Sequence, residues 1–159
     1  MHISESKVGK IFERVLADLD SYNWPRIEQH KQERWVTKHI VRPVVLNTLL
    51  EIGEKRLILS SDGEYAPKKI IKYGMSFAPD LDITYLDQRC IAFEVKLLRD
   101  SDASGSITKA LGQAIIYKEL GYENTLCLTF DCRTRKSSRL TDFALEKNYL
   151  HSKVKMRCF

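Results

Sequence analysis

The stretch APDLDITYLDQRCIAFEVKLL, residues 78–98, carries the clearest structural signal in the chain. Residues 81–86 alternate between apolar and polar side chains, 87–89 are turn formers, and 90–98 form a second apolar run. This pattern is typical of two antiparallel strands joined by a short turn. Glu94 and Lys96 nevertheless stand inside the second run. The stretch therefore predicts a hairpin with charged side chains on one face.

Strand geometry indicates how these charges are arranged. Successive side chains of a strand point to opposite faces, so Glu94 and Lys96 share one face. The opposite face, which can pack on a helix, consists of Phe93, Val95 and Leu97. Asp80 begins the first strand after Pro79, which stiffens the entry and cannot donate to the ladder. Because the turn folds the chain back, we expect Asp80 to approach the segment from Glu94 to Lys96.

Helix and strand patterns flank the hairpin and define the fold class. We expect helices at 5–19 (capped by Ser4), 27–52 (kinked at Pro43 and ended by Gly53), 107–120 and 140–149. We expect further strands at 57–59, 70–73, 125–130 and 154–159, and a polar loop at 99–106. This order predicts an α/β (α+β) fold with a mixed sheet, because an antiparallel hairpin excludes a purely parallel sheet.

Length and composition indicate one globular domain of 159 residues, with residues 1–25 as an N-terminal helical extension and 26–159 as the core. The net charge of +5 and the pI of about 9.0 are compatible with a nucleic acid as partner. The four cysteines form no Cys-x-x-Cys pair, which favours buried thiols in a reducing compartment. The first residues contain no apolar signal segment, and no run is long enough to span a membrane. We therefore expect a cytoplasmic protein without a membrane partner.

The expected cluster of Asp80, Glu94 and Lys96 suits one kind of chemistry. Two carboxylates and a backbone carbonyl, such as that of Val95, are ligands for Mg²⁺, and Mn²⁺ is expected to substitute. A bound metal polarises a phosphoryl oxygen and lowers the pKa of a coordinated water. Lys96 can orient or deprotonate that water and can offset negative charge that develops on phosphate. The cluster therefore predicts metal-assisted hydrolysis of a phosphodiester.

Pro79-Asp80 followed by Glu94-Val95-Lys96 resembles the signature of the PD-(D/E)XK nuclease superfamily. The resemblance implies a restriction-endonuclease-like αβββαβ core, here with an extra N-terminal helix. It also implies that Asp80 and Glu94 bind the metal and that Lys96 assists the water. The expected activity is that of a Mg²⁺-dependent deoxyribonuclease, an endonuclease with DNA as its partner.

Two further segments resemble nucleases of this superfamily. Gln113 and Tyr117 share a helix face, and Gln-x-x-x-Tyr stands at this place in members fused to recombination helicases, which implies a supporting catalytic role. Residues 33–43 resemble the opening of nuclease domains in type I restriction subunits, in which a Glu on the first core helix can join the metal shell. Glu33 is our candidate for that role. Its rivals are Glu51 and Glu64, and Asp82 is either an extra ligand or a solvated strand residue.

Several basic side chains are candidates for contact with DNA. They are Lys68, Lys69, Lys72, Lys109 and the cluster 133–139, although such charges also occur simply as solvated surface. The four histidines show no metal-ligand spacing, and no phosphate-binding glycine motif is present. A homodimer or association with a larger DNA-processing complex stays open.

Two other functions compete with the nuclease. One is a nucleic-acid-binding or assembly subunit that keeps the fold and does not cleave. The other is a metal-independent interaction protein with a charged hairpin. The three converging charges favour the enzyme, because neither alternative needs them.

Overall fold

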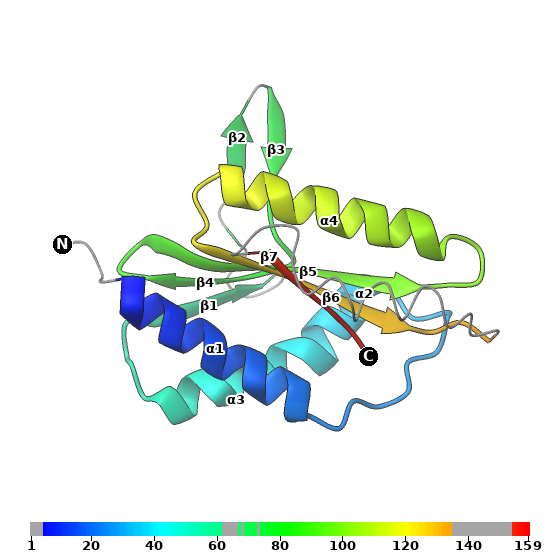
Figure 1. The fold of residues 1–159 in the computed structure, drawn as a ribbon, viewed down its shortest axis with the longest axis horizontal. Helices are drawn as coiled ribbons and strands as arrows, with labels where there is room; N and C mark the ends of the chain where they lie inside the picture. Colours follow the sequence, from blue (N-terminus) through cyan, green and yellow to red (C-terminus); the bar gives the residue numbers. More distant parts are fainter. Residues whose placement is uncertain (1–4, 62–66, 68, 73, 135–153) are drawn as a thin grey trace.

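A mixed five-stranded sheet organises the computed structural model, which describes residues 5–61, 67, 69–72, 74–134 and 154–159. Helices α1 (Glu5–Ser21) and α3 (Arg42–Ile52) cover one face of the sheet, and α4 (Ala103–Glu119) covers the other (Figure 1). The strands, in spatial order, are β1 (Leu57–Ser61), β4 (Leu81–Tyr85), β5 (Gln88–Leu98), β6 (Asn124–Asp131) and β7 (Val154–Cys158). The protein is therefore a mixed α/β fold, as predicted.

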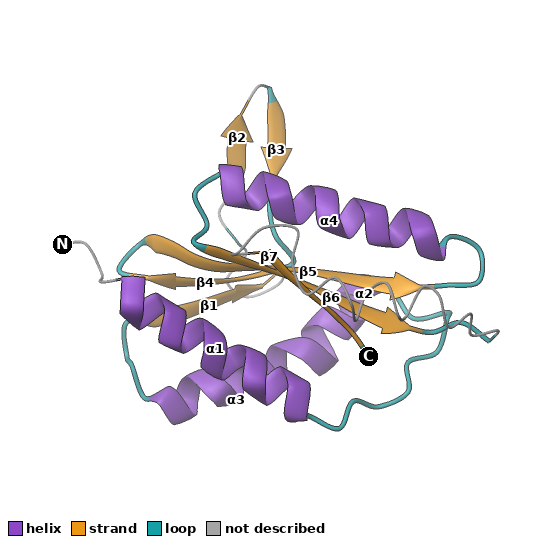
Figure 2. Cartoon of the chain, viewed as in Figure 1, coloured by secondary structure: helices purple, strands orange, loops and turns teal. Residues whose placement is uncertain are grey.

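Strand directions change in the middle of the sheet. β4 runs antiparallel to both of its neighbours, β1 and β5, whereas β6 runs parallel to β5 and β7 parallel to β6. α4 makes the crossover that a parallel β5–β6 pair requires (Figure 2). Among the described residues, no helix is long and apolar enough to cross a membrane.

The hairpin between β4 and β5 is confirmed, but its turn lies one residue earlier than predicted. Tyr85 pairs with Gln88, so only Leu86 and Asp87 form the loop. Both have positive φ, of 49° and 61°, as a type I′ turn requires to match the twist of the strands. The predicted turn at 87–89 is therefore wrong in position, because Gln88 already belongs to β5.

The second helix is shorter than the apolar spacing predicts. It consists of α2 (Glu33–Val36), the π-helical turn η1 (Thr37–Val41) and α3. Pro43 follows this irregular turn, which agrees with the expected disruption of regular helical hydrogen bonding. Residues 27–32 are not helical, because Arg99 donates hydrogen bonds to the carbonyl oxygens of Gln29 (2.9 Å) and Lys31 (2.7 Å). These two carbonyl oxygens therefore have hydrogen-bond donors that do not belong to a helix.

Two other boundaries differ from the prediction. α4 begins at Ala103 instead of Ile107, because Ala103 is buried against the same cluster as Leu98. Strand β3 (Met75–Phe77) was not predicted and pairs with β2 (Ile70–Lys72) in a separate two-stranded sheet. The predicted helix at 140–149 lies outside the described residues.

The main core lies between the sheet and helices α1 and α3. Phe93, Val95 and Leu97 are fully buried in it, as the strand alternation predicts. From α1 it receives Val8, Ile11, Phe12, Val15, Leu16 and Leu19. The segment predicted as an N-terminal extension therefore supplies a large share of the core.

Shortening a core side chain of α1 tests this packing. Leu19 is 0% exposed, so Leu19→Ala should lower the free energy of unfolding by about 2–5 kcal/mol, measured by urea denaturation. Leu50→Ala is the matched control, because Leu50 is 69% exposed and should change stability by no more than about 0.5 kcal/mol. Equal, small effects of both changes would contradict the packing of α1 on the sheet.

Candidate active site

Asp80 directly precedes β4, beside the part of β5 that extends beyond the pairing of the two strands. Its N–H donates to the carbonyl oxygen of Phe93 (3.1 Å), and its carboxylate Oδ2 accepts a hydrogen bond from the N–H of Val95 (2.8 Å). In a strand the N–H and C=O of one residue point to the same side, so the Val95 carbonyl faces this edge too. Asp80 thus approaches the segment from Glu94 to Lys96, as the hairpin predicts.

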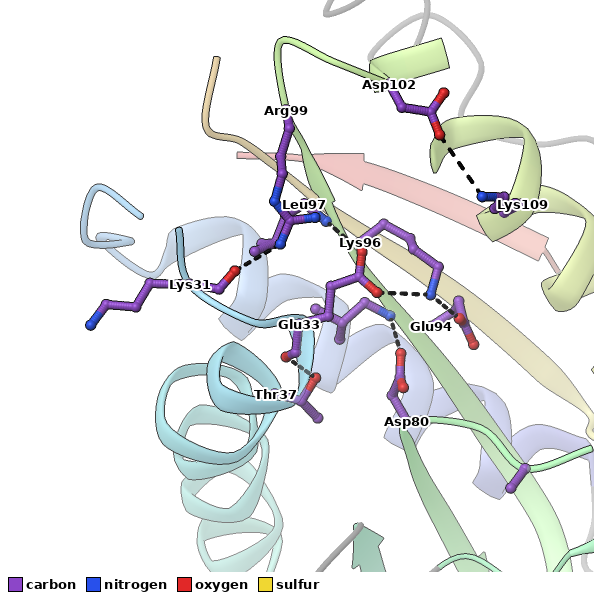
Figure 3. A network of polar contacts seen from close by, with 12 residues as sticks. Lys31, Glu33, Thr37, Asp80, Glu94, Lys96, Leu97, Arg99, Asp102 and Lys109 are labelled. Atoms are coloured by element: carbon purple, nitrogen blue, oxygen red, sulfur yellow. Dashed lines mark hydrogen bonds and ion pairs between the residues drawn. The ribbon is translucent and has the colours of Figure 1, made fainter. Parts of the chain in front are cut away.

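Glu94 and Lys96 project together from β5 on the face covered by α4. Glu94 is buried, with only 2% exposed, and the Lys96 side chain is only 12% exposed, so the pair does not form a solvated strand face. Lys96 Nζ lies 2.5 Å from Glu94 Oε1 and 3.3 Å from Glu33 Oε2 (Figure 3). The ammonium group therefore bridges two carboxylates from distant parts of the chain.

Of the three candidates for an additional carboxylate, Glu33 lies at the site. It is the first residue of α2, and its Oε1 accepts a hydrogen bond from the N–H of Leu97 (3.3 Å). Glu51 instead pairs with Arg14 of α1 at 2.6 Å. Glu64 lies outside the described residues. The tertiary structure thus brings a carboxylate from the first core helix to the same edge of β5 as Asp80.

Tyr117 connects α4 to this cluster. Its buried hydroxyl oxygen lies 2.8 Å from the carbonyl oxygen of Ala78 and 3.1 Å from Glu94 Oε2. Burial and the charge of Glu94 raise the pKa of Tyr117, while a hydrogen bond from Gln113 opposes that shift. Both residues of the Gln-x-x-x-Tyr pair are therefore placed beside the carboxylates.

The ionisation of Glu94 and Lys96 follows from their burial and neighbours. Burial raises the pKa of Glu94 to about 7, and the negative charge of Asp80 adds to this against the opposing effect of Lys96. Burial lowers the pKa of Lys96, but the charges of Glu94, Asp80 and Glu33 outweigh it and leave this pKa above its usual value. Lys96 is therefore an ammonium ion at neutral pH, which favours orienting a water over deprotonating it.

Asp82 contacts a residue that the sequence did not single out. It is buried, and its Oδ2 accepts a hydrogen bond from the hydroxyl of Tyr122 at 2.7 Å. The interpretation of Asp82 as a solvated strand residue is therefore wrong. Tyr122 follows α4 and carries no local signal for this role, because the pair spans 40 residues of sequence.

A hollow of about 290 Å³ opens beside Lys96. Its charged and amide lining includes Glu33, Lys96, Arg99, Asp102, Lys109 and Gln113. The sequence missed Arg99, although it closely follows Lys96, because its contacts reach segment 29–31 far earlier in the chain. Lys109 is exposed at the rim of this hollow, and its Nζ lies 3.8 Å from Asp102 Oδ2.

The other predicted DNA contacts fall in different environments. Lys69, directly before β2, and Lys72, the last residue of β2, are both exposed. Arg133 is buried in an ion pair with Asp131 at 2.8 Å, so its side chain does not belong to a solvated basic cluster. Lys68 and residues 135–139 lie outside the described residues.

The donor set fits a metal that keeps part of its water shell. Within the described part of the chain, no three His, Cys, Asp or Glu side chains form a compact metal-binding group. Asp80 lies at the edge of β5, where it accepts a hydrogen bond from the Val95 N–H, and its charge acts on Glu94 on the adjoining face. Lys96 joins Glu94 to Glu33. Mg²⁺ typically takes one or two protein carboxylates and completes its shell with water and substrate phosphate.

No protein-family model matches the sequence, and searches of the curated proteins and of the solved structures also find no match to the chain. The geometry of the residues therefore carries the functional interpretation.

The raised pKa of Glu94 predicts a pH-dependent stability in metal-free protein. The folded state keeps the proton on Glu94 up to about pH 7, whereas the unfolded chain releases it near pH 4.5. The folded state therefore binds more protons in this window, and the free energy of unfolding falls as pH rises through it.

Urea denaturation in EDTA at pH 5 and pH 8 measures this difference. Between these values the wild type should lose up to about 3 kcal/mol of stability relative to Glu94→Gln, which cannot titrate. If the free energies of unfolding of the two proteins differ by the same amount at pH 5 and pH 8, the burial of an ionisable Glu94 is contradicted.

Proposed function

We propose that the chain is a metal-dependent nuclease of the PD-(D/E)XK type that hydrolyses phosphodiester bonds in DNA. The observation that carries this proposal is that Asp80 accepts a hydrogen bond from the N–H of Val95, the residue between Glu94 and Lys96, which form an ion pair. Apart from the separate ribbon β2–β3, the chain order α3, β1, β4, β5, α4, β6 supports it, because this is the αβββαβ order of a restriction-endonuclease-like core. The change from antiparallel to parallel pairing at β5 is compatible with that core.

Asp80, Glu94 and the Val95 carbonyl are the proposed ligands of Mg²⁺, with Glu33 as an additional carboxylate. A bound metal would polarise a phosphoryl oxygen and lower the pKa of a coordinated water. Lys96, as an ammonium ion, donates hydrogen bonds to the attacking water or to the developing negative charge on phosphate. Tyr117 fixes the orientation of Glu94 from the side of α4.

The alternative of a DNA-binding subunit that does not cleave has one observation in its favour. Lys96 already bridges Glu94 and Glu33, so the carboxylates have a cationic partner without any metal. In that alternative the cluster has a structural role and does not catalyse cleavage. Cleavage and metal-binding assays separate the two functions.

A plasmid cleavage assay with Mg²⁺ tests the nuclease directly. Asp80→Asn, Glu94→Gln and Lys96→Ala should each reduce the cleavage rate by about 10²-fold or more, since each removes a group that acts on the reacting phosphate or its metal. EDTA should abolish cleavage, and Mn²⁺ should support it.

Glu51→Gln is the matched control for the carboxylate variants, because Glu51 pairs with Arg14 and not with the site. It should cleave like the wild type, and circular dichroism should show that all variants are folded. DNA binding by a wild type that never cuts would favour the non-cleaving subunit instead.

Titration calorimetry with Mn²⁺ tests the ligand set without any DNA. The wild type should bind Mn²⁺, and Asp80→Asn should weaken binding by about tenfold or more, because it removes the charge of one proposed carboxylate ligand. Glu51→Gln should leave the affinity unchanged. Equal Mn²⁺ affinities of Asp80→Asn and the wild type would exclude Asp80 as a ligand.

A further inference from the structure

Strands β2 and β3 form a two-stranded antiparallel ribbon outside the main sheet, and Figure 1 shows it projecting beyond α4. Ile70 pairs with Phe77, Ile71 with Ser76, and Lys72 with Met75. We call this ribbon, residues 69–72 and 74–77, the arm. The described part of the chain places no third strand beside it.

The base of the arm is fixed to the candidate active site. Ile70 and Phe77 are half-buried and pack against the cluster of Tyr117, Tyr122 and Leu120. An isolated two-stranded ribbon is marginally stable at best, so these contacts hold the arm in place. Ala78 follows β3 directly, and its carbonyl oxygen lies 2.8 Å from the hydroxyl of Tyr117, which also contacts Glu94. The arm therefore has a defined position relative to the carboxylates.

The rest of the arm presents aliphatic side chains and lysines to solvent. Ile71 is 78% exposed and Met75 is 55% exposed, although both are large and apolar. Because directly paired residues share a face, Met75 and Lys72 lie on one face and Ile71 on the other, together with Lys69. Residues 67–78 contain three lysines and no Asp or Glu. Each face thus combines an apolar contact with a positive charge.

We propose that the arm inserts into the major groove of duplex DNA, with Lys69 and Lys72 at phosphates and with the face of Ile71 against base edges, because the opposite face packs at its base on the cluster of Tyr117. The major groove admits a two-stranded β-ribbon, and aliphatic side chains there contact thymine methyl groups. A second copy of the same arm is disfavoured as occupant, because the lysines of the two copies repel each other. This inference rests on the proposed nuclease function and specifies that the substrate of the nuclease is duplex DNA, bound beside the site.

Fluorescence anisotropy with the full chain in EDTA tests the arm apart from cleavage. The probes are a labelled duplex of about three helical turns and one of its strands alone, titrated between about 50 and 200 mM salt. The double variant Lys69→Ala with Lys72→Ala should bind the duplex roughly tenfold more weakly or worse, and its salt slope should fall by about 2. Ile71→Ser should weaken duplex binding at an unchanged salt slope, and should do so more than Met75→Ser on the opposite face.

Matched controls lie on the opposite side of the sheet. Lys55→Ala removes an exposed lysine between α3 and β1, and Leu50→Ser removes an exposed aliphatic side chain of α3. Both should bind duplex like the wild type. The inference is overturned if the arm variants bind duplex like these controls, or if they lose affinity for duplex and single strand equally. It is also overturned if the arm variants change the molar mass in light scattering, because the arm would then join two copies.

The two proposals fail in different ways. A wild type that cuts plasmid while the arm variants keep full duplex affinity retains the nuclease and rejects the arm. A wild type that binds duplex through the arm but never cuts rejects the nuclease and retains the arm as a DNA-binding element.

Discussion

Strand β5 extends past the end of its antiparallel neighbour, and the backbone groups along that unpaired edge determine how the site is built. β5 has eleven residues and β4 only five, so the pairing stops at Leu81 and Phe93. Beyond this point the N–H groups of Val95 and Leu97 have no strand partner on that side, and buried N–H groups need acceptors. Asp80 and Glu33 supply carboxylate oxygens to them. Two negative charges are thereby brought to the edge of β5 by the requirements of the backbone itself.

The same arrangement places charge in the interior, which is unfavourable for folding. Glu94 lies beneath α4, and burial together with Asp80 disfavours its ionised form. Lys96 compensates part of this, yet a buried ion pair seldom stabilises a fold more than apolar side chains of the same volume would. A cluster that folding alone does not favour, beside a hollow lined by Arg99 and Lys109, supports the proposal of an active site here.

The sequence predicted those features that depend on neighbouring residues. The alternation in 78–98 was sufficient to locate the hairpin and to assign Glu94 and Lys96 to one face, because strand periodicity is local. It named Glu33 as the candidate through a resemblance but could not exclude Glu51 and Glu64, and it could not reveal the contacts of Arg99 with residues 29–31, since these depend on tertiary packing. The predicted position of the turn was wrong because Leu86 adopts a positive φ, which a side chain of this type rarely does.

Tyr117 links the arm to the ionisation of the site through a single proton. Its hydroxyl lies within hydrogen-bonding distance of both the Ala78 carbonyl and Glu94, but it has only one hydrogen to donate. A protonated Glu94 can donate to Tyr117, which then donates to Ala78 at the base of the arm. An ionised Glu94 competes with Ala78 for the same hydrogen. The hydrogen bond between Tyr117 and Ala78 is thus coupled to the charge of Glu94, so ionisation of Glu94 also acts on the connection between the arm and the site.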